Sequence, residues 1–195
     1  MTALVIACGA LARELLDIVT VNQLDSIDVE CLPARLHNHP ERIPAAVESR
    51  IRRSRGLYDR IFVGFADCGT GGALDRMLAR HGVERLPGAH CYEVFATAPV
   101  FDALHQAEPG TFYLTDYLAR HFDRLVVSGL GLDTHPELEP LYFGHYRRLV
   151  HLAQVDDPGL GAAGRSAAHR LGLEHERRLV GYGDLAPAIA ALDGS

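Results

Sequence analysis

Short apolar runs alternate with amphipathic stretches along the whole chain. The apolar runs predict strands at residues 4–7, 27–32, 60–65, 83–86, 124–128, 149–153 and 177–181. Apolar residues at helical spacing predict helices at 10–23, 41–53, 72–81, 92–104, 115–121, 136–146, 161–171 and 185–192. Strands that alternate with helices pair in parallel, so we expect an α/β fold, with a mostly parallel sheet and helices on both faces. No linker or repeat interrupts the pattern, which predicts a single domain over residues 1–195.

Composition adds the expectation of a soluble cytoplasmic protein. The chain has 195 residues, of which 48% are hydrophobic and 23% charged, as in ordinary globular proteins. No apolar run approaches the roughly 20 residues that a membrane-spanning helix needs. The first segment, MTALVIACGALARELL, reaches Arg13 and Glu14 too early for a secretory signal. We therefore expect no membrane association.

The charged residues exclude several classes of function. The net charge is −6, and the one basic run, at residues 50–55, ends a predicted helix, where the helix dipole favours cations. Because nucleic-acid binding needs a broader basic face, we expect no nucleic-acid partner. All nineteen basic residues are arginine. Without lysine, the chain cannot use Schiff-base chemistry or a P-loop.

Residues capable of chemistry follow the first four predicted strands. They are Cys8 after the first strand, His37 and His39 after the second, Asp67 and Cys68 after the third, and His90, Cys91 and Glu93 after the fourth. In open α/β sheets, binding sites form outside the carboxyl ends of the strands. These side chains are therefore expected to share one edge of the sheet. Cys31 lies inside its strand, which favours packing in the core.

Thiolate and imidazole groups on converging loops favour a metal site. Zinc is expected first, bound by Cys8, Cys68 and either His90 or Cys91, with His37 as a fourth ligand or an acid/base group. An iron–sulfur cluster is the alternative, because three thiolates with one free position would also hold one. Glu93 or Asp67 would then move protons for a small-molecule substrate.

Two alternatives without a catalytic metal stay open. In the first, Cys68 is the nucleophile of a metal-free enzyme, and His90 or His37 is its base. In the second, the chain is an accessory protein that carries a cofactor to a partner enzyme. The amides of Gly71 and Gly72 either approach a carboxylate or phosphate of the substrate, or simply form a turn.

Five segments together resemble a known family: ACGAL, LHNHPE, GFADCGTGGAL, PGAHCYEVF and PGTFYLTDYL. They are similar to the domain-of-unknown-function family number 1638, over most of the chain. The resemblance implies that Cys8, His37, Cys68, His90 and Cys91 are motif residues. The chain departs from the family pattern at Gly88, where the family has arginine, and by placing Cys91 directly after His90.

The same resemblance implies a metabolic setting. Some members of the family lie near corrinoid-dependent methyltransferase systems, which implies methyl-group or one-carbon metabolism with a methyltransferase or corrinoid protein as partner. The sequence thus leads us to expect a cytoplasmic, zinc-binding α/β protein. Its enzymatic activity would be that of a metal-dependent transferase, lyase or hydrolase acting on a small molecule.

Overall fold

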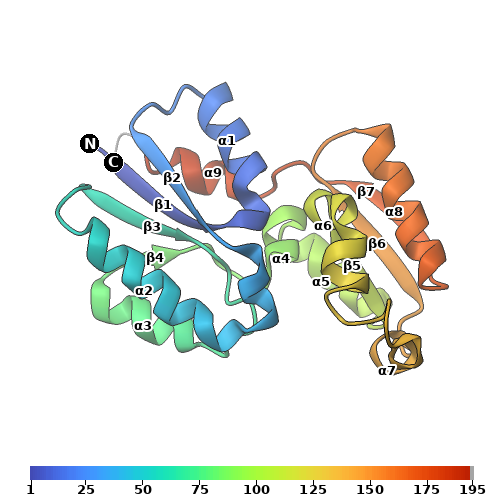
Figure 1. Ribbon diagram of the computed structural model, residues 1–195. Coiled ribbons are helices and arrows are strands. Elements are labelled where there is room, and N and C mark those ends of the chain that lie inside the picture. The colour runs from blue at the N-terminus through green and yellow to red at the C-terminus, as the bar shows by residue number, and fades with distance from the viewer. Residues whose placement is uncertain (194–195) are drawn as a thin grey trace. The chain divides into compact units, whose positions relative to one another are not determined.

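The α/β class is confirmed, and the parallel strands form two sheets instead of the one expected. The computed structural model describes residues 1–193 (Figure 1). Its strands pair in the orders β2-β1-β3-β4 and β5-β6-β7, in parallel throughout. The chain folds into two compact units: Met1–Val94 with the segment from Tyr182 onwards is the first unit, and Phe95–Gly181 is the second. That the two act as a single domain stays a prediction.

The first unit holds the four-stranded sheet. Its strands are β1 (Ala3–Cys8), β2 (Ile27–Leu32), β3 (Arg60–Gly64) and β4 (Glu84–Arg85), and every residue of β1 is buried. Helices α1 (Ala12–Val21) and α9 (Leu185–Ala190) pack together on one face, and α2 (Ile43–Ser54) and α3 (Ala73–His81) on the other (Figure 1). Short helical turns η1 (Gly9–Leu11), η2 (Ala34–Asn38) and η3 (Pro40–Arg42) and helix α4 (Cys91–Ala96) follow the strand ends.

The second unit holds the three-stranded sheet. Its strands are β5 (Thr111–Thr115), β6 (Arg148–Ala153) and β7 (Glu174–Leu179). Its helices are α5 (Ala98–Ala107), α6 (Asp116–Arg120), α7 (Glu139–Phe143) and α8 (Pro158–Arg170), with turns η4 (Asp123–Val127) and η5 (Pro136–Leu138). A cluster that includes Leu114, Phe122, Phe143 and Leu149 forms its core.

The structure differs from the predicted elements at three segments between residues 92 and 128. The apolar run at 124–128, expected as a strand, belongs to the π-helical turn η4, because Phe122 and Val126 are four residues apart and both enter the core. The segment Thr111–Thr115, which was given no strand, forms β5 beside β6. The helix expected at 92–104 is interrupted at Thr97, whose φ of 67° lies in the left-handed region.

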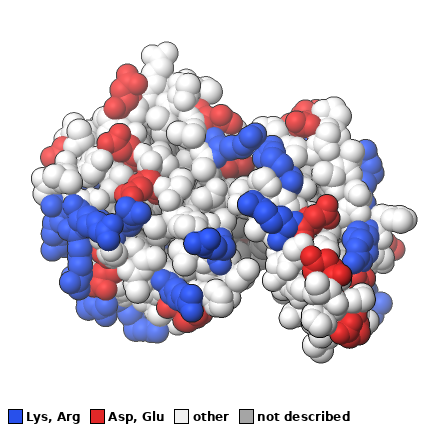
Figure 2. Space-filling view, in the orientation of Figure 1, with Lys and Arg blue, Asp and Glu red and all other residues white. Residues whose placement is uncertain are grey.

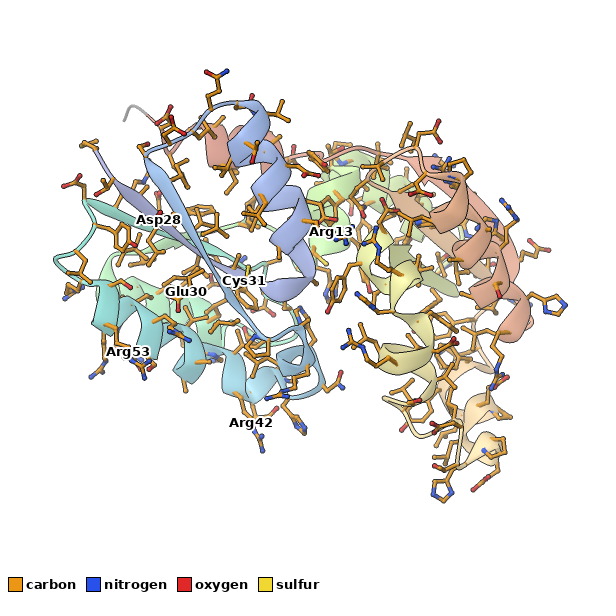
Figure 3. All side chains as sticks on the ribbon, turned by 45° about the horizontal axis from the view of Figure 1, so that its top comes forward. Arg13, Asp28, Glu30, Cys31, Arg42 and Arg53 are labelled. Atoms are coloured by element: carbon orange, nitrogen blue, oxygen red, sulfur yellow. The ribbon has the colours of Figure 1, made fainter. Side chains whose placement is uncertain are left out.

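Strand β2 lies at the edge of its sheet, and its four middle residues are exposed or half-buried. Only Ile27 and Leu32 are buried, and Figure 3 labels Asp28, Glu30 and Cys31 along the strand. Cys31 is exposed, so the expectation that it packs in the core is wrong. The position of β2 is the reason, since an edge strand keeps solvent on part of its surface.

The arginine-rich end of α2 is explained by local electrostatics. Arg52 and Arg53 lie in the last turn, where cations offset the helix dipole, and Arg52 also pairs with Glu48 at 2.9 Å. Arg50 pairs with Glu30 of β2. Figure 2 shows arginine side chains gathered over the face of the first unit that α2 and α3 form. Among residues 1–193, no helix is both long enough and apolar enough to cross a lipid bilayer.

Candidate functional site

Cys8 is held at the carboxyl end of β1. Its side chain is buried, and its Sγ accepts a hydrogen bond from the amide of Ala10 at 3.3 Å. Gly9 allows η1 to lie against the end of β2, because a side chain there would begin 3.0 Å from the carbonyl oxygen of Leu32. The thiol is therefore fixed at the point where the first two strand-end loops meet.

His37 comes from η2 and approaches the Cys8 thiol. Its Nδ1 lies 3.7 Å from Cys8 Sγ and 3.0 Å from the carbonyl oxygen of Ala34, and its ring stacks on Phe65 at 6.2 Å. Because a carbonyl only accepts, Nδ1 carries the proton and Nε2 keeps its lone pair. Burial lowers the pKa of His37, and the nearby His90 lowers it further, against the Ala34 hydrogen bond. The imidazole is thus neutral, as a metal ligand must be.

Cys68 occupies a strained backbone position. Its φ is 51°, in the left-handed region, which costs a residue with a side chain about 1–2 kcal/mol. The amide of Cys68 donates to the carbonyl of Ala89 at 2.9 Å, and that of Asp67 donates to Gly88 at 3.1 Å. The third and fourth strand-end loops are therefore joined. Strain of this kind is characteristic of functional positions.

Asp67 builds the turn that follows Cys68. Its carboxylate accepts hydrogen bonds from Thr70 Oγ1 at 2.6 Å and from the amides of Gly72 and Gly71 at 2.9 and 3.1 Å. Burial alone would raise the pKa of Asp67, but these hydrogen bonds outweigh it and lower the pKa. The amides of Gly71 and Gly72, which were expected either to bind a substrate anion or to form a turn, therefore donate their hydrogen bonds to a carboxylate of the chain itself.

The fourth loop carries His90, Cys91 and Glu93. Glu93 accepts a hydrogen bond from the amide of Ala89 at 2.9 Å, so its carboxylate holds the loop. Gly88 makes room for it, because a side chain there would begin 2.7 Å from Glu93 Oε2. Cys91 begins α4, and the exposed His90 ring lies 6.3 Å from that of Tyr92.

The structure brings three thiols within electrostatic reach of one another. Burial, followed by the charge of Cys68, raises the pKa of Cys8 to about 12, although the Ala10 amide opposes the shift. Burial also raises the pKa of Cys68 to about 11. The pKa of Cys91 is raised by burial first and then by Cys68 and Cys8. At neutral pH all three are protonated thiols when no cation is bound.

Glu14 was not predicted as part of this region. It lies in the first turn of α1, is 5% exposed, and its charge further raises the pKa of Cys91. The signal was present in the sequence, because Glu14 falls on the buried helix face with Leu11, Leu15 and Ile18. A carboxylate on that face cannot be explained by core packing alone.

His90 and Cys91, the two alternatives for one metal ligand, differ in the groups with which they interact. Cys91 interacts electrostatically with both Cys8 and Cys68, whereas His90 interacts with His37 from an exposed position. Over residues 1–193, no three histidine, cysteine, aspartate or glutamate side chains already stand in a geometry that could hold a metal ion. Metal binding would therefore require deprotonation of the thiols and movement of the side chains.

Comparison with known proteins places these loops in a family. The family model described as "Protein of unknown function (DUF1638)" matches residues 31–189. The chain belongs to this family. The resemblance inferred from the sequence motifs is thereby confirmed, and the part matched to the DUF1638 model contains His37, Cys68, His90 and Cys91. No curated protein and no solved structure matches the chain.

Proposed function

We propose that the first unit binds a zinc ion through Cys8, Cys68 and Cys91, with His37 as the fourth ligand. The observation that supports this is the convergence of two buried thiols and one half-buried thiol, each from a different strand end, beside a neutral imidazole. Three thiolates and one imidazole are a donor set that zinc takes in structural sites. Cys91 replaces His90 in this set because it interacts with both other thiols.

The electrostatics favour a cation over a free nucleophile. Three thiols with raised pKa values hold almost no thiolate at neutral pH, which disfavours Cys68 as the nucleophile of a metal-free enzyme. A divalent metal would replace the three thiol protons, and its positive charge would stabilise the thiolates that burial otherwise disfavours. The same argument holds for an iron–sulfur cluster, which stays the second candidate.

His37 is the group that links this site to catalysis. Its exposure makes it accessible to a small molecule, and the Ala34 carbonyl keeps its proton on Nδ1. Zinc, when bound, supplies a Lewis acid. In an enzyme, the three cysteines would hold the metal, and His37 would accept a proton from the substrate at Nε2. Asp67 and Glu93 hold the loops, so we assign them positioning instead of proton transfer.

The reaction class rests on the family resemblance. A transferase, lyase or hydrolase acting on a small molecule in methyl-group metabolism, with a methyltransferase or corrinoid protein as partner, is the corresponding proposal. Affinity capture with purified corrinoid protein and methyltransferase tests it. Saturable binding to either supports the proposal, and absence of binding to both in the zinc-loaded state contradicts it.

Metal analysis tests the zinc site directly. The untagged protein is purified anaerobically without chelator, and its zinc, iron and absorbance are measured. We expect one zinc ion per chain and no visible colour. Cys8→Ser, Cys68→Ser and Cys91→Ser should each lose zinc, whereas the exposed Cys31→Ser is the matched control and should retain it.

Two results would overturn the metal proposal. One is a protein without stoichiometric metal that contains a single thiol hypersensitive to alkylation at neutral pH, which supports the nucleophile alternative. The other is full zinc occupancy in Cys68→Ser. A brown protein with iron and acid-labile sulfide would replace zinc with a cluster at the same thiols.

A further inference from the structure

A cavity of about 420 Å³ opens on the second unit between residues 119–124 and helix α8. Helix α6, which ends at Arg120, packs against α8 (Figure 1). The residues that α8 contributes to the lining are Ala163, Ser166, Ala167 and Arg170. Their spacing of three and four residues places them on one face of the helix, and the small size of most of them leaves the space. The volume lies in the range of small-molecule binding sites, about 300–1,000 Å³.

The floor of this cavity is apolar and its rim carries arginines. Ala119, Phe122 and Ala167 belong to the buried core of the unit, and Ala163 packs against that core. These side chains offer no hydrogen bonds, so they suit the hydrocarbon part of a ligand. The half-buried Arg120 and the exposed Arg124 and Arg170 line the same space closer to the solvent. A ligand that fits has an apolar body and an anionic group.

Arg120 and Arg124 lie one helical turn apart. The chain between them stays helical, since the amide of Leu125 donates to the carbonyl of His121 at 2.9 Å. Residues four apart on a helix are neighbours on its surface, and two like charges in that arrangement repel each other. Within residues 1–193, neither guanidinium group has an ion pair or a hydrogen-bond partner. An anion bound between them removes this repulsion.

The remaining charges leave the cavity positive. Arg170 is paired with Glu139, so its charge is offset. Asp123 also lines the cavity, is exposed, and forms no ion pair in the described part of the chain. The two unpaired guanidinium groups therefore outnumber the unpaired carboxylate.

The backbone beside these arginines is also unusual. The π-helical turn η4 begins at Asp123, whose carbonyl accepts a hydrogen bond from the amide of Ser128 at 2.7 Å. Wider turns of this kind are rare and occur frequently at functional sites. The irregular backbone and the unpaired arginines therefore coincide at one cavity.

We propose that this cavity binds a small phosphate monoester. Its phosphate group lies between Arg120 and Arg124, because guanidinium groups bind phosphate through paired N–H donors. A monoester carries a charge of about −1.5 to −2 at pH 7, which matches two unpaired guanidinium groups. Its organic part lies on the apolar floor that Phe122 and the alanines form. The site goes beyond the zinc site proposed for the first unit, and neither depends on the other.

Calorimetry with the full chain tests the site, with phenyl phosphate as the probe. Benzoate carries the same ring with a carboxylate, phenol lacks the anionic group, and inorganic phosphate lacks the ring. We expect phenyl phosphate to saturate the protein at millimolar concentration or below. It should bind about tenfold more tightly than each of the other three, because only phenyl phosphate uses both the rim and the floor.

Substitutions separate the two parts of the site. Arg120→Gln and Arg124→Gln should each weaken phenyl phosphate binding about tenfold, the loss expected for one hydrogen bond between charged groups. The matched control is Arg165→Gln, which removes an exposed arginine of α8 that does not line the cavity and should leave the affinity unchanged. Ala163→Leu fills the floor, so it should weaken phenyl phosphate binding and leave inorganic phosphate binding unchanged. Thermal unfolding of each variant verifies its fold.

Amide NMR locates the ligand independently of its affinity. Phenyl phosphate should shift the amide signals of residues 119–124 and 163–170 and leave those of the first unit in place. The proposal is overturned if phenyl phosphate does not saturate the wild type, if the shifts lie elsewhere, or if both arginine variants keep the full affinity. Benzoate that binds as tightly as phenyl phosphate would overturn the assignment to a phosphate.

Discussion

The two units bury opposite kinds of chemistry under similar architecture. In the first unit, the buried groups are thiols, acids that burial keeps protonated and that become anions only beside a cation. In the second unit, they are imidazole and guanidinium nitrogens, and His151 Nδ1, His175 Nε2 and Arg177 Nε have no hydrogen-bond partner in the described part of the chain. The architecture of a parallel sheet covered by helices therefore determines where buried polar groups gather. The residue types determine which chemical partner those groups need.

The clusters also differ in where their residues come from. The thiols lie at the end of a strand or in the loops that follow strand ends, so the parallel pairing of β1, β3 and β4 brings them to one edge of the sheet. The nitrogen cluster lies within β6 and β7 and on one face of α8, so it exists only when strand pairing and helix packing are both complete. The first should tolerate substitution better than the second.

The largest expected effect is the loss of the carboxylate under His151. Asp116→Ala leaves a buried imidazole and two buried amides without their acceptor. Each buried donor left without an acceptor costs about 1–3 kcal/mol, so we expect a loss of about 3–5 kcal/mol of unfolding free energy in all. Urea unfolding of the purified protein measures it. The exposed Asp123→Ala is the control, expected within about 0.5 kcal/mol of the wild type. A similarly small change for Asp116→Ala would contradict the network.

Two glycines on α8 give a matched pair with opposite expected signs. Gly164→Ala places a methyl group 2.7 Å from His151 Nδ1, and because Asp116 holds that ring, we expect a loss of about 1–3 kcal/mol. Gly161→Ala meets its nearest atoms at 3.6 Å, an ordinary contact, and should gain up to about 1 kcal/mol from helix propensity. Thermal unfolding of both variants measures the difference. Equal effects would show that α8 does not press on His151.

The pH dependence of the unfolding free energy tests the buried thiols of the first unit. Cys8 and Cys68 have pKa values of about 12 and about 11 in the folded protein, against an ordinary 9.0. Folding then favours the protonated thiols, so their contribution is complete below about pH 9 and is lost as the pH rises through 11 to 12. The metal-free protein should therefore unfold more easily above about pH 9, with a shallower decline in Cys8→Ala.

Added zinc should flatten that decline, because bound thiolates carry no proton to lose. Denaturant midpoints measured at several pH values, with and without zinc, test this. A stability of the metal-free protein that stays constant over this pH range would contradict the predicted effect of the thiols. An alkaline slope of the wild type that zinc leaves unchanged would contradict zinc binding at these thiols.

The smallest effect is expected at Cys31. Its thiol is exposed, so it should be the first cysteine alkylated by iodoacetamide at about pH 8, ahead of the buried Cys8 and Cys68. Peptide mass spectrometry over a time course measures the order. Cys31→Ala should change the unfolding free energy by no more than about 0.5 kcal/mol. Earlier labelling of Cys68 would instead support a reactive thiol in the first unit.

Sequence pattern predicted several of the strands, whether buried like β1 or at a sheet edge like β2. The segment 27–32 was predicted with its observed bounds, and the expected strands at 4–7 and 149–153 lie inside β1 and β6. The run at 124–128 failed because a short apolar segment fits a strand and a helical turn equally well, and only the core decides. The division of the strands into two sheets could not be predicted from the sequence either, since a local pattern does not show which strands pair.

The sequence by itself determined the α/β class, the family motifs and the strand-end positions of Cys8, His37, Cys68 and Cys91, because these follow from local periodicity and chain order. Tertiary structure alone decided that Asp67 binds the glycine amides, that Glu14 comes within electrostatic reach of Cys91, and that His151 meets His175 under α8. The physical reason is that burial and strand register set which polar groups lose water together, and neither is a property of any short stretch of chain.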